Sequence, residues 1–332
     1  MEYPSLDKPK AGAFRYNTDS SKLEIYDGNQ WSDIVATSPE NETGGTRAIS
    51  GGGLGSGPSH IVYCNVESTG NTVNFGSFAA GSSTHSLQAG SSRTRGIFSG
   101  GYRNTIEYVT IASTGSAVDF GDMIDYQNNT SMAYSSNHLR MLTYGGYNTP
   151  NPSTSSYTGV TDIRYITIPT TGNSRDFGDI TGTWRYFMAA VASPTRGVYG
   201  GGTPTSITDY VTIASQGNAS SFGDIDGGVK YSAHSNAVRG VFSGNNSTSM
   251  CKYITISTLG NHIDFGSLSN ARNYNGATGS CTRGLVMGGY PAADDQTTID
   301  YYQIATTADL TDFGDIQARG RNACLSNGHG GL

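Results

Sequence analysis

Apolar and polar residues alternate in short runs along most of the chain, and this pattern predicts β-strands rather than helices. The stretch 106–111, Ile-Glu-Tyr-Val-Thr-Ile, is typical, with six residues of mostly β-branched and aromatic character. Its apolar residues fall on both parities, which predicts a strand with both faces at least partly buried. Glycine-rich turns separate such runs, so the pattern indicates an all-β fold.

One of these runs recurs six times with a fixed spacing. Each copy has a tyrosine and, twelve residues later, a Phe-Gly pair. An arginine opens a short apolar run upstream of each tyrosine, and a glycine doublet or Gly-Asn follows that run. Such self-similarity indicates a repeat architecture. The tyrosines and phenylalanines are Tyr63 and Phe75, Tyr108 and Phe120, Tyr165 and Phe177, Tyr210 and Phe222, Tyr253 and Phe265, and Tyr301 and Phe313. The arginines are Arg47, Arg95, Arg140, Arg196, Arg239 and Arg283.

Each repeat has room for four short antiparallel strands, as in one blade of a β-propeller. The first repeat begins at its second strand, near Thr46, whereas the stretch 318–327 after the last Phe-Gly is similar to the missing first strands. We therefore expect a strand near 321–327 to pair with the strand that opens at Thr46. This pairing closes the ring and leaves no open sheet edge. The predicted fold is all-β, a six-bladed propeller over 46–332 with four antiparallel strands per blade.

The order of an apolar strand, a glycine doublet, a variable loop and a tyrosine strand resembles the kelch-type propellers. Phe-Gly stands where the full kelch pattern has a tryptophan, so the chain looks like a divergent kelch-like branch. The resemblance implies an architecture and no particular activity, because propellers host enzymes and scaffolds alike.

Residues 1–36 follow a different pattern. Phe14, Tyr16, Leu23 and Ile25 alternate with polar residues, and Asp27-Gly28 marks a tight turn. These features predict a three-stranded β-meander that is too small to be stable alone. Residues 37–45 are polar and predict a flexible linker. We expect residues 1–36 to be a docking or oligomerisation module, with a homotrimer as the favoured assembly.

Two passages resemble proteins of virus particles. Arg-Tyr-Asn-Thr at 15–18 and Tyr-Asp-Gly-x-x-Trp at 26–31 are similar to a short module of phage tail-fibre and related virion proteins. Thr-Arg-Gly-Val-Tyr-Gly-Gly-Gly at 195–202 and Asp-Tyr-Val-Thr-Ile-Ala at 209–214 resemble virion structural proteins of marine cyanophages. The resemblance implies a non-catalytic fibre, appendage or capsid decoration protein, located in the virion. It would contact other virion proteins through residues 1–36 and a host-surface glycan or protein, or neighbouring capsid, through the propeller.

Composition argues against several classes of partner. Charged residues make up 14 % of the chain, well below the ~25 % of an average protein. The net charge of −6 disfavours nucleic acid, which requires a basic face. No stretch approaches the ~20 apolar residues of a membrane span, so no membrane insertion is expected. The four cysteines lack metal-ligand spacing and are predicted to be reduced core residues: Cys64, Cys251, Cys281 and Cys324.

No catalytic, metal or cofactor site is predicted. Four Asp-Phe-Gly triplets match the metal-binding motif of kinases, but they recur at one repeat position without a phosphate-binding loop, so a structural role is expected. The histidines show no zinc spacing. Sialidase propellers clamp a carboxylate with three arginines from non-equivalent positions, whereas the six arginines here are repeat-equivalent. They too are expected to be structural, and one candidate role is pairing with the aspartates of Asp-Phe-Gly-Asp.

Length variation indicates where binding takes place. The distance from arginine to tyrosine ranges from 13 to 25 residues, whereas the distance from tyrosine to phenylalanine never changes. The variable loops between second and third strands share one face of a propeller, and loops on a rigid scaffold often carry function. Tyrosine and asparagine suit carbohydrate or protein contact, and Asp294-Asp295 is either a cation site or simply solvated. The candidate binding residues are Tyr147, Asn148, Asn151, Tyr157, Tyr290, Asp294 and Asp295.

An alternative function is a glycan-binding or glycan-cleaving propeller of the sialidase or oxidase type. A cleaving enzyme requires a paired acid and base at the central funnel, and the sequence shows none.

Overall fold

The structure is a computed structural model of the full chain, and its described part is all-β. It describes residues 9–18, 22–34, 45–55, 59–79, 86–101, 103–124, 133–148, 158–225, 231–245, 248–290 and 296–332. These residues form strands, turns and bends and no helix. Accordingly, no described helix is long and apolar enough to cross a membrane.

The N-terminal meander is a three-stranded antiparallel sheet, as the sequence predicts. Its strands are β1 (Phe14–Asn17), β2 (Lys22–Tyr26) and β3 (Trp31–Asp33). Phe14 pairs with Ile25 and Tyr16 pairs with Leu23, so these four side chains share one face of the sheet. Phe14 and Tyr16 are 64 % and 62 % exposed. The meander therefore has an apolar face that none of the described residues covers.

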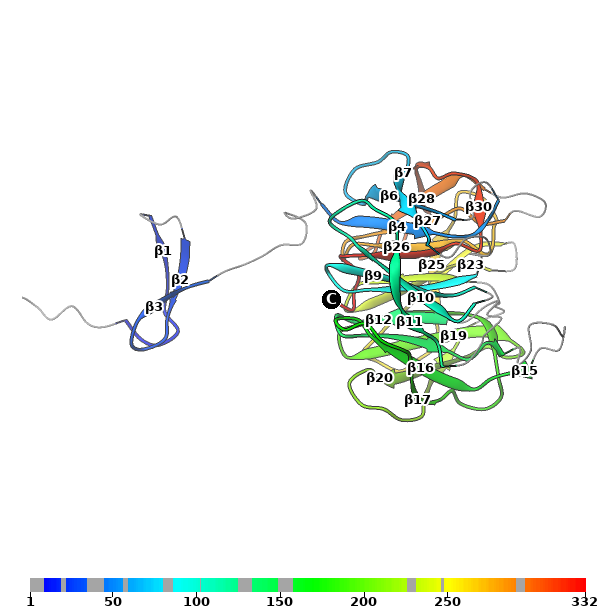
Figure 1. Cartoon of the computed structure of the whole chain (residues 1–332), viewed down its shortest axis with the longest axis horizontal. Coiled ribbons are helices and arrows are strands. Elements are labelled where there is room, and N and C mark those ends of the chain that lie inside the picture. The colour runs from blue at the N-terminus through cyan, green and yellow to red at the C-terminus, as the bar shows by residue number, and fades with distance from the viewer. Residues whose placement is uncertain are drawn as a thin grey trace, which may run out of the picture.

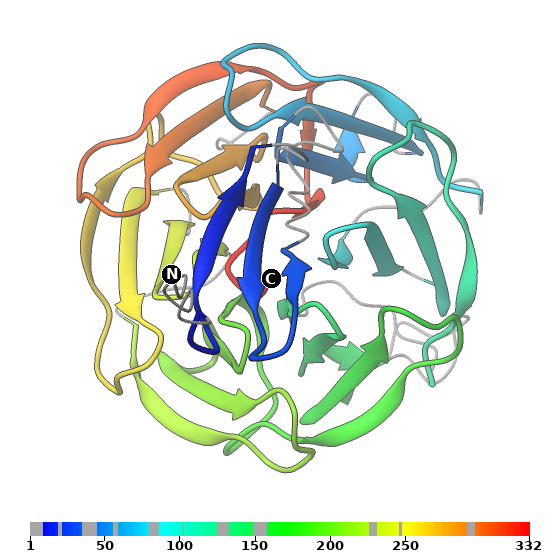
Figure 2. The same cartoon turned by 90° about the vertical axis from the view of Figure 1, so that its left-hand side faces the viewer.

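Each sequence repeat forms one four-stranded antiparallel sheet, and the sheets have a propeller-like arrangement around a common centre (Figures 1 and 2). In each sheet the first strand of the repeat lies innermost. Repeat two contains β8 (Leu87–Ser91), β9 (Arg95–Gly100), β10 (Thr105–Thr110) and β11 (Val118–Asp122); repeat three contains β12 (Ala133–Ser136), β13 (Arg140–Tyr144), β16 (Asp162–Thr167) and β17 (Arg175–Asp179); repeat four contains β18 (Tyr186–Ala192), β19 (Arg196–Thr203), β20 (Ile207–Thr212) and β21 (Ser220–Asp224). Repeat five contains β22 (Ser232–Ser235), β23 (Arg239–Asn245), β24 (Thr248–Thr255) and β25 (Ile263–Ser267); repeat six contains β26 (Gly276–Gly279), β27 (Arg283–Met287), β28 (Thr298–Gln303) and β29 (Thr311–Asp315).

The sheet of repeat one joins the two ends of the repeat region. Its strands are β4 (Arg47–Gly51), β6 (His60–Asn65), β7 (Val73–Ser77) and the C-terminal strand β31 (Ala323–Ser326). Strand β31 pairs with β4 from Ala323–Gly51 to Ser326–Ala48. The sequence-based prediction of this pairing is confirmed. Two short pairs complete the described strands: β14 (Tyr147–Asn148) with β15 (Thr158–Gly159), and β30 (Arg319–Gly320) with β5 (Leu54–Gly55).

The repeat phenylalanines are buried between neighbouring sheets. All six are at most 3 % exposed. Phe177, for example, belongs to a cluster that includes Val211 and Ile213 from the sheet of the next repeat. Each phenylalanine meets the tyrosine of its own repeat edge to face, with ring centroids 5.7–6.3 Å apart. The constant spacing of twelve residues therefore preserves one aromatic pair per sheet.

The six repeat arginines tie each sheet to the next. Each guanidinium stacks on the tyrosine ring of its own repeat, 4.4–4.9 Å from the ring centroid. Each Nη1 also donates to a backbone carbonyl of the next sheet, from Arg47 to Ile111 O at 2.9 Å through to Arg283, which reaches Val66 O in repeat one at 2.9 Å. Among the described residues none of these arginines pairs with an aspartate of Asp-Phe-Gly-Asp. The proposed pairing is wrong because Nη1 is used by the carbonyls.

The Phe-Gly glycine is required where neighbouring sheets meet at their outer strands. A Cβ at Gly121 would collide with the backbone of Gly172 in the next repeat. The amide of Gly172 donates to Phe120 O at 2.8 Å, and the amide of Asp122 donates to Asn173 Oδ1 at 3.0 Å. The same backbone bond joins the last repeat to the first, from Gly70 N to Phe313 O at 2.9 Å. The Asp-Phe-Gly triplets thus occupy a packing position.

The cysteines differ from their prediction at one position. All four are free, and Cys64, Cys251 and Cys324 are buried as expected. Cys281 is exposed, because it lies in the turn between β26 and β27 rather than in a strand.

Candidate functional site

The described ends of the variable loops lie on the same face of the array of sheets as the mouth of the central cavity. Inner strands begin at the mouth, and the antiparallel second strands return there to end in glycine doublets. Gly146 N donates to Arg185 O at 2.8 Å, and Gly289 N donates to Arg319 O at 2.9 Å. These bonds connect the end of a second strand to the segment that precedes the next inner strand. The described ends of the loops between second and third strands therefore lie beside the mouth.

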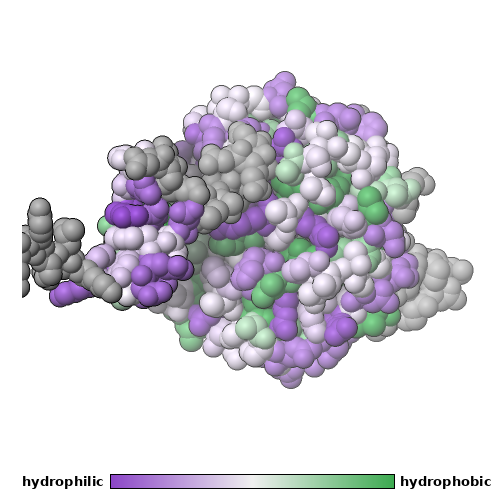
Figure 3. Space-filling model, turned by 60° about the vertical axis from the view of Figure 1, so that its left-hand side comes forward, coloured by the Kyte–Doolittle hydropathy of each residue, from purple (hydrophilic) through white to green (hydrophobic). Residues whose placement is uncertain are grey.

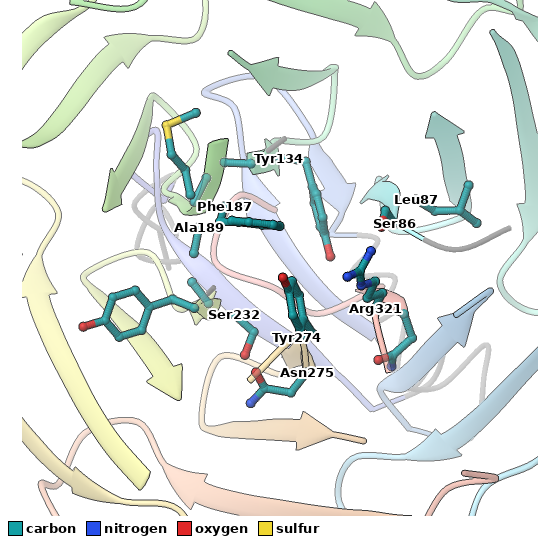
Figure 4. Close-up of a pocket in the computed structure, with 15 residues that line it drawn as sticks. Ser86, Leu87, Tyr134, Phe187, Ala189, Ser232, Tyr274, Asn275 and Arg321 are labelled. Atoms are coloured by element: carbon teal, nitrogen blue, oxygen red, sulfur yellow. The ribbon is translucent and has the colours of Figure 1, made fainter. Parts of the chain in front are cut away.

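The cavity at this mouth is shallow and contains about 100 Å³ of free space. This volume is below the ~300–1,000 Å³ of a pocket that encloses a small molecule. Its walls are formed by neutral side chains and one cation, Arg321, and no described aspartate or glutamate lines it. Figure 4 shows Tyr134, Tyr274 and Arg321 directed toward one another near its centre. The cavity is thus suited to hold part of a ligand that extends over the surrounding face.

Four residues at the mouth have a backbone conformation that side chains disfavour. Ser86, Phe187, Tyr274 and Arg321 have φ of 60°, 61°, 53° and 58°, and they are the only described non-glycine residues with positive φ. All four line the cavity. They occupy equivalent repeat positions at the start of inner strands: Ser86 directly precedes β8, Phe187 is the second residue of β18, and Tyr274 and Arg321 lie two residues before β26 and β31. A left-handed residue costs about 1–2 kcal/mol, and such strain is concentrated at functional sites.

A chain of touching aromatic rings crosses this face. Tyr147 lies 5.5 Å from Trp184 and 4.5 Å from Tyr186, measured between ring centroids. Tyr186 contacts Phe187 at 4.8 Å, and Phe187 contacts Tyr274 at 5.3 Å although they belong to repeats four and six. Tyr274 then contacts Tyr290 at 6.0 Å. We call these six residues the aromatic arc: Tyr147, Trp184, Tyr186, Phe187, Tyr274 and Tyr290.

Polar groups without partners accompany the arc. The Arg321 guanidinium stacks on Tyr274 at 4.5 Å, and its Nε has no hydrogen-bond partner. The Asn275 side chain is 7 % exposed, and neither atom of its amide is hydrogen-bonded. Oδ1 of Asn322 is also unpaired. Buried polar atoms are normally satisfied, so these atoms leave unused hydrogen-bonding capacity in the lining of the cavity.

The structure places two of the residues predicted to bind at the two ends of one series of ring contacts. Tyr147 and Tyr290 are both in the aromatic arc. Burial, together with a hydrogen bond to Tyr186, raises the pKa of Tyr147, so its hydroxyl stays protonated. Asn148 lies in β14. The other candidates lie outside the described residues: Asn151, Tyr157, Asp294 and Asp295.

Sequence reasoning missed the centre of the site, namely Trp184, Tyr186, Phe187, Tyr274 and Arg321. A signal was present at the position nine residues before the repeat arginine. Across repeats two to six this position holds Ser86, Ser131, Phe187, Lys230 and Tyr274. A position that varies inside an otherwise regular repeat indicates a role other than packing.

Three further arginines lie near the mouth but do not form a carboxylate clamp. Arg185, Arg272 and Arg319 are at most 1 % exposed. Arg185 pairs with Asp209, and Arg272 pairs with Asp300 at 2.9 Å. Arg319 donates to the carbonyls of Gly52 and His60, at 3.3 Å each. Their guanidinium groups are thus used within the protein, in contrast to the arginines of a sialidase.

The C-terminal segment fills the opposite end of the central channel. His329 Nε2 lies 3.0 Å from Ser91 O, and Gly330 N donates to Ser235 O at 2.8 Å. Serine hydroxyls join neighbouring inner strands around it, for example Ser91 Oγ to Ser326 O at 2.6 Å. Among the described residues, the C-terminal segment thus lies at the end opposite the aromatic arc.

Two histidines in this closed end predict a loss of stability in acid. Burial, with a smaller contribution from nearby positive charge (Arg93 for His329, and His329 for His234), lowers the pKa of His329 and of His234 to about 4 each. The unfolded chain binds protons below about 6.5, so it takes up more protons than the folded chain between pH 6.5 and 4. The contribution of these two neutral histidines to the free energy of unfolding is therefore fully present above pH 6.5 and decreases as the pH is lowered. The urea midpoint should decrease between pH 7 and pH 5.

Replacing both histidines with glutamine should flatten this part of the profile. An unmodified protein with the same urea midpoint at pH 7 and pH 5 would contradict the assignment.

No group of described histidine, cysteine, aspartate and glutamate side chains is arranged to hold a metal ion. No protein-family description matches the chain, and a search of curated proteins finds no significant relative.

Proposed function

We propose that the chain is a non-catalytic structural protein of a phage particle, a fibre, appendage or capsid decoration of the kind found in marine cyanophages. Residues 1–36 dock it to other virion proteins or trimerise it, and 37–45 act as a linker. Residues 46–332 form a closed, six-bladed, kelch-like propeller. The propeller contacts the host surface or a neighbouring virion protein.

Contacts between the last and the first repeats support a closed ring. Strand β31 supplies the inner strand of the sheet that contains β4. Arg283 and Phe313 of repeat six make the same contacts with Val66 and Gly70 of repeat one that their counterparts make with the next sheet. A ring in which all seams are equivalent has no free edge for aggregation.

The observation that carries the proposed function is that the two faces of the ring differ: the chain enters on one face, and the aromatic arc lies on the other. The chain enters from the meander at Arg47, whose amide donates to Asn327 Oδ1 at 2.8 Å beside the closed end of the channel. The aromatic arc lies at the opposite end, and Figure 1 shows β15 and β30 there, away from the C-terminus. Attachment and presentation thus occupy opposite faces, as a particle-bound recognition protein requires.

The meander supports docking because its apolar face is uncovered. Phe14, Tyr16 and Leu23 are each at least 46 % exposed, whereas Figure 3 shows hydrophobic side chains scattered among hydrophilic ones on the ring. A sheet of this size needs to bury such a face against a partner to be stable.

The lining of the cavity favours binding over catalysis. The alternative, a glycan-cleaving enzyme, needs two carboxyl groups flanking the scissile bond. No described carboxylate lines the cavity.

The proposal predicts that a shortened protein starting at Gly44 folds as a soluble monomer but does not enter particles. Its melting temperature and mass should be measured together with its incorporation during phage assembly. A full-length protein with Arg175→Gln, a change at an exposed residue of the outer strand β17, serves as the control and should assemble normally. Normal incorporation of the shortened protein would assign docking to the ring instead.

A further inference from the structure

We infer that the open end of the channel binds an acidic sugar unit of a polysaccharide, with its carboxylate on Arg321 and its ring against Tyr274. The inference deepens the proposed function by naming the ligand class. It concerns a site in the isolated protein, so it is tested without a particle.

The backbone at this site is strained. Phe187 and Tyr274 are bulky, and such residues rarely adopt positive φ. In the described chain every non-glycine residue with this conformation lines the one cavity mouth. The strain holds side chains over the channel that a relaxed backbone would direct elsewhere. This preorganisation reduces the ordering cost of binding a ligand.

The site carries a positive charge, on Arg321. Among the described residues that line the cavity, Arg321 is the only charged one, in a protein of net charge −6. It is half-buried, stacked on Tyr274, and has an unpaired Nε, and no described ion pair neutralises it. A guanidinium in this setting forms strong, directional hydrogen bonds with a carboxylate. The ligand should therefore carry an anionic group.

Aromatic rings and amide groups surround this cation. The rings of Phe187 and Tyr274 provide an apolar wall next to it. The unpaired amide of Asn275 provides a neutral donor and acceptor within the same lining, and the unpaired Oδ1 of Asn322 provides a further acceptor. A sugar has an apolar C–H face and a rim of hydroxyl groups, and this combination matches one ring wall with adjacent amides.

The cavity is smaller than a whole sugar unit. The free space of about 100 Å³ holds only part of one sugar, and the aromatic arc extends from it toward Tyr147 and Tyr290. A polymer would place one acidic unit at Arg321 and neighbouring units along the arc. Polysaccharides of a cell surface have this form.

The test measures binding of the full-length protein to three acidic oligosaccharides: tetragalacturonate, a hyaluronan tetrasaccharide and sialyllactose. Each is compared with its carboxyl-reduced, neutral form by calorimetry and by tryptophan fluorescence, to which Trp31 and Trp184 both contribute. We expect at least one acidic oligosaccharide to bind with a Kd below about 10 mM, and its reduced form to bind at least about tenfold more weakly.

Two variants then locate the site. Arg321→Gln removes the charge, and Tyr274→Asn removes the ring while keeping a residue that tolerates a left-handed backbone. Each should weaken binding about tenfold or more while the protein keeps its cooperative urea unfolding. Arg175→Gln should bind like the unmodified protein. No binding to any of the three oligosaccharides, or unchanged binding by Arg321→Gln, overturns the inference. Neither result bears on docking through residues 1–36, which is measured separately by incorporation.

Discussion

Deleting residues 318–332 should unfold the entire array of sheets in one cooperative step or prevent it from folding. The deletion removes β31, whose side chains belong to two cores. Leu325 packs with Ile49 and Phe98 between repeats one and two, whereas Cys324 packs with Met287 between repeats one and six. Its loss opens both cores and leaves β4 with an unpaired inner edge. Circular dichroism and urea unfolding of the shortened protein measure the effect.

A smaller deletion provides the control. Removing only His329–Leu332 leaves β31 paired with β4, so the protein should still fold cooperatively, although with a lower urea midpoint. Unchanged melting after the loss of 318–332 would show that the C-terminal strand does not hold the first and last repeats together.

Phe177→Ala should reduce the free energy of unfolding by about 3–5 kcal/mol, the usual cost of removing a buried phenylalanine ring. Phe177 is 2 % exposed and lies edge to face with Tyr165, at 6.2 Å between centroids. It also fills the space against Val211 and Ile213 of the next sheet. The substitution therefore leaves a cavity between two sheets, and urea denaturation at neutral pH measures its cost.

Val118→Ala is the matched control, because Val118 lies in an equivalent outer strand but is 53 % exposed. Its effect should stay within about 0.5 kcal/mol, as for most surface substitutions. A loss below 1 kcal/mol for Phe177→Ala would place the ring outside the core and remove the physical basis of the repeat.

The regular part of the fold was predictable because the same residues pack in the same way in each repeat. The fixed spacing of tyrosine and phenylalanine corresponds to one edge-to-face pair per sheet, and the missing first strand of repeat one predicted its pairing with β31. The role of the arginines was not predictable from spacing alone. Their partners are carbonyls of the next sheet, and a carbonyl has no sequence signature.

The binding face was predictable only at its ends. Tyr147 and Tyr290 were identified by loop length, but Phe187 meets Tyr274 across the centre of the ring, between repeats that are not consecutive. Such a contact depends on the left-handed conformation of both residues, and no local pattern predicts that conformation for an aromatic side chain. Variation among equivalent repeat positions was the one signal that pointed to it.

The course of β4 has a mechanical consequence. Strand β4 begins at Arg47, beside the C-terminal segment. Under the proposed function tension would enter there, and a ligand held at the aromatic arc would pull from the opposite face. Tension between the two runs along β4, which is paired with β31 on one side and with β6 on the other. Hydrogen bonds on both sides would be sheared together instead of being unzipped one after another, and shear of many bonds at once resists force best. The order of strands in this one sheet thus suits the molecule to carry load.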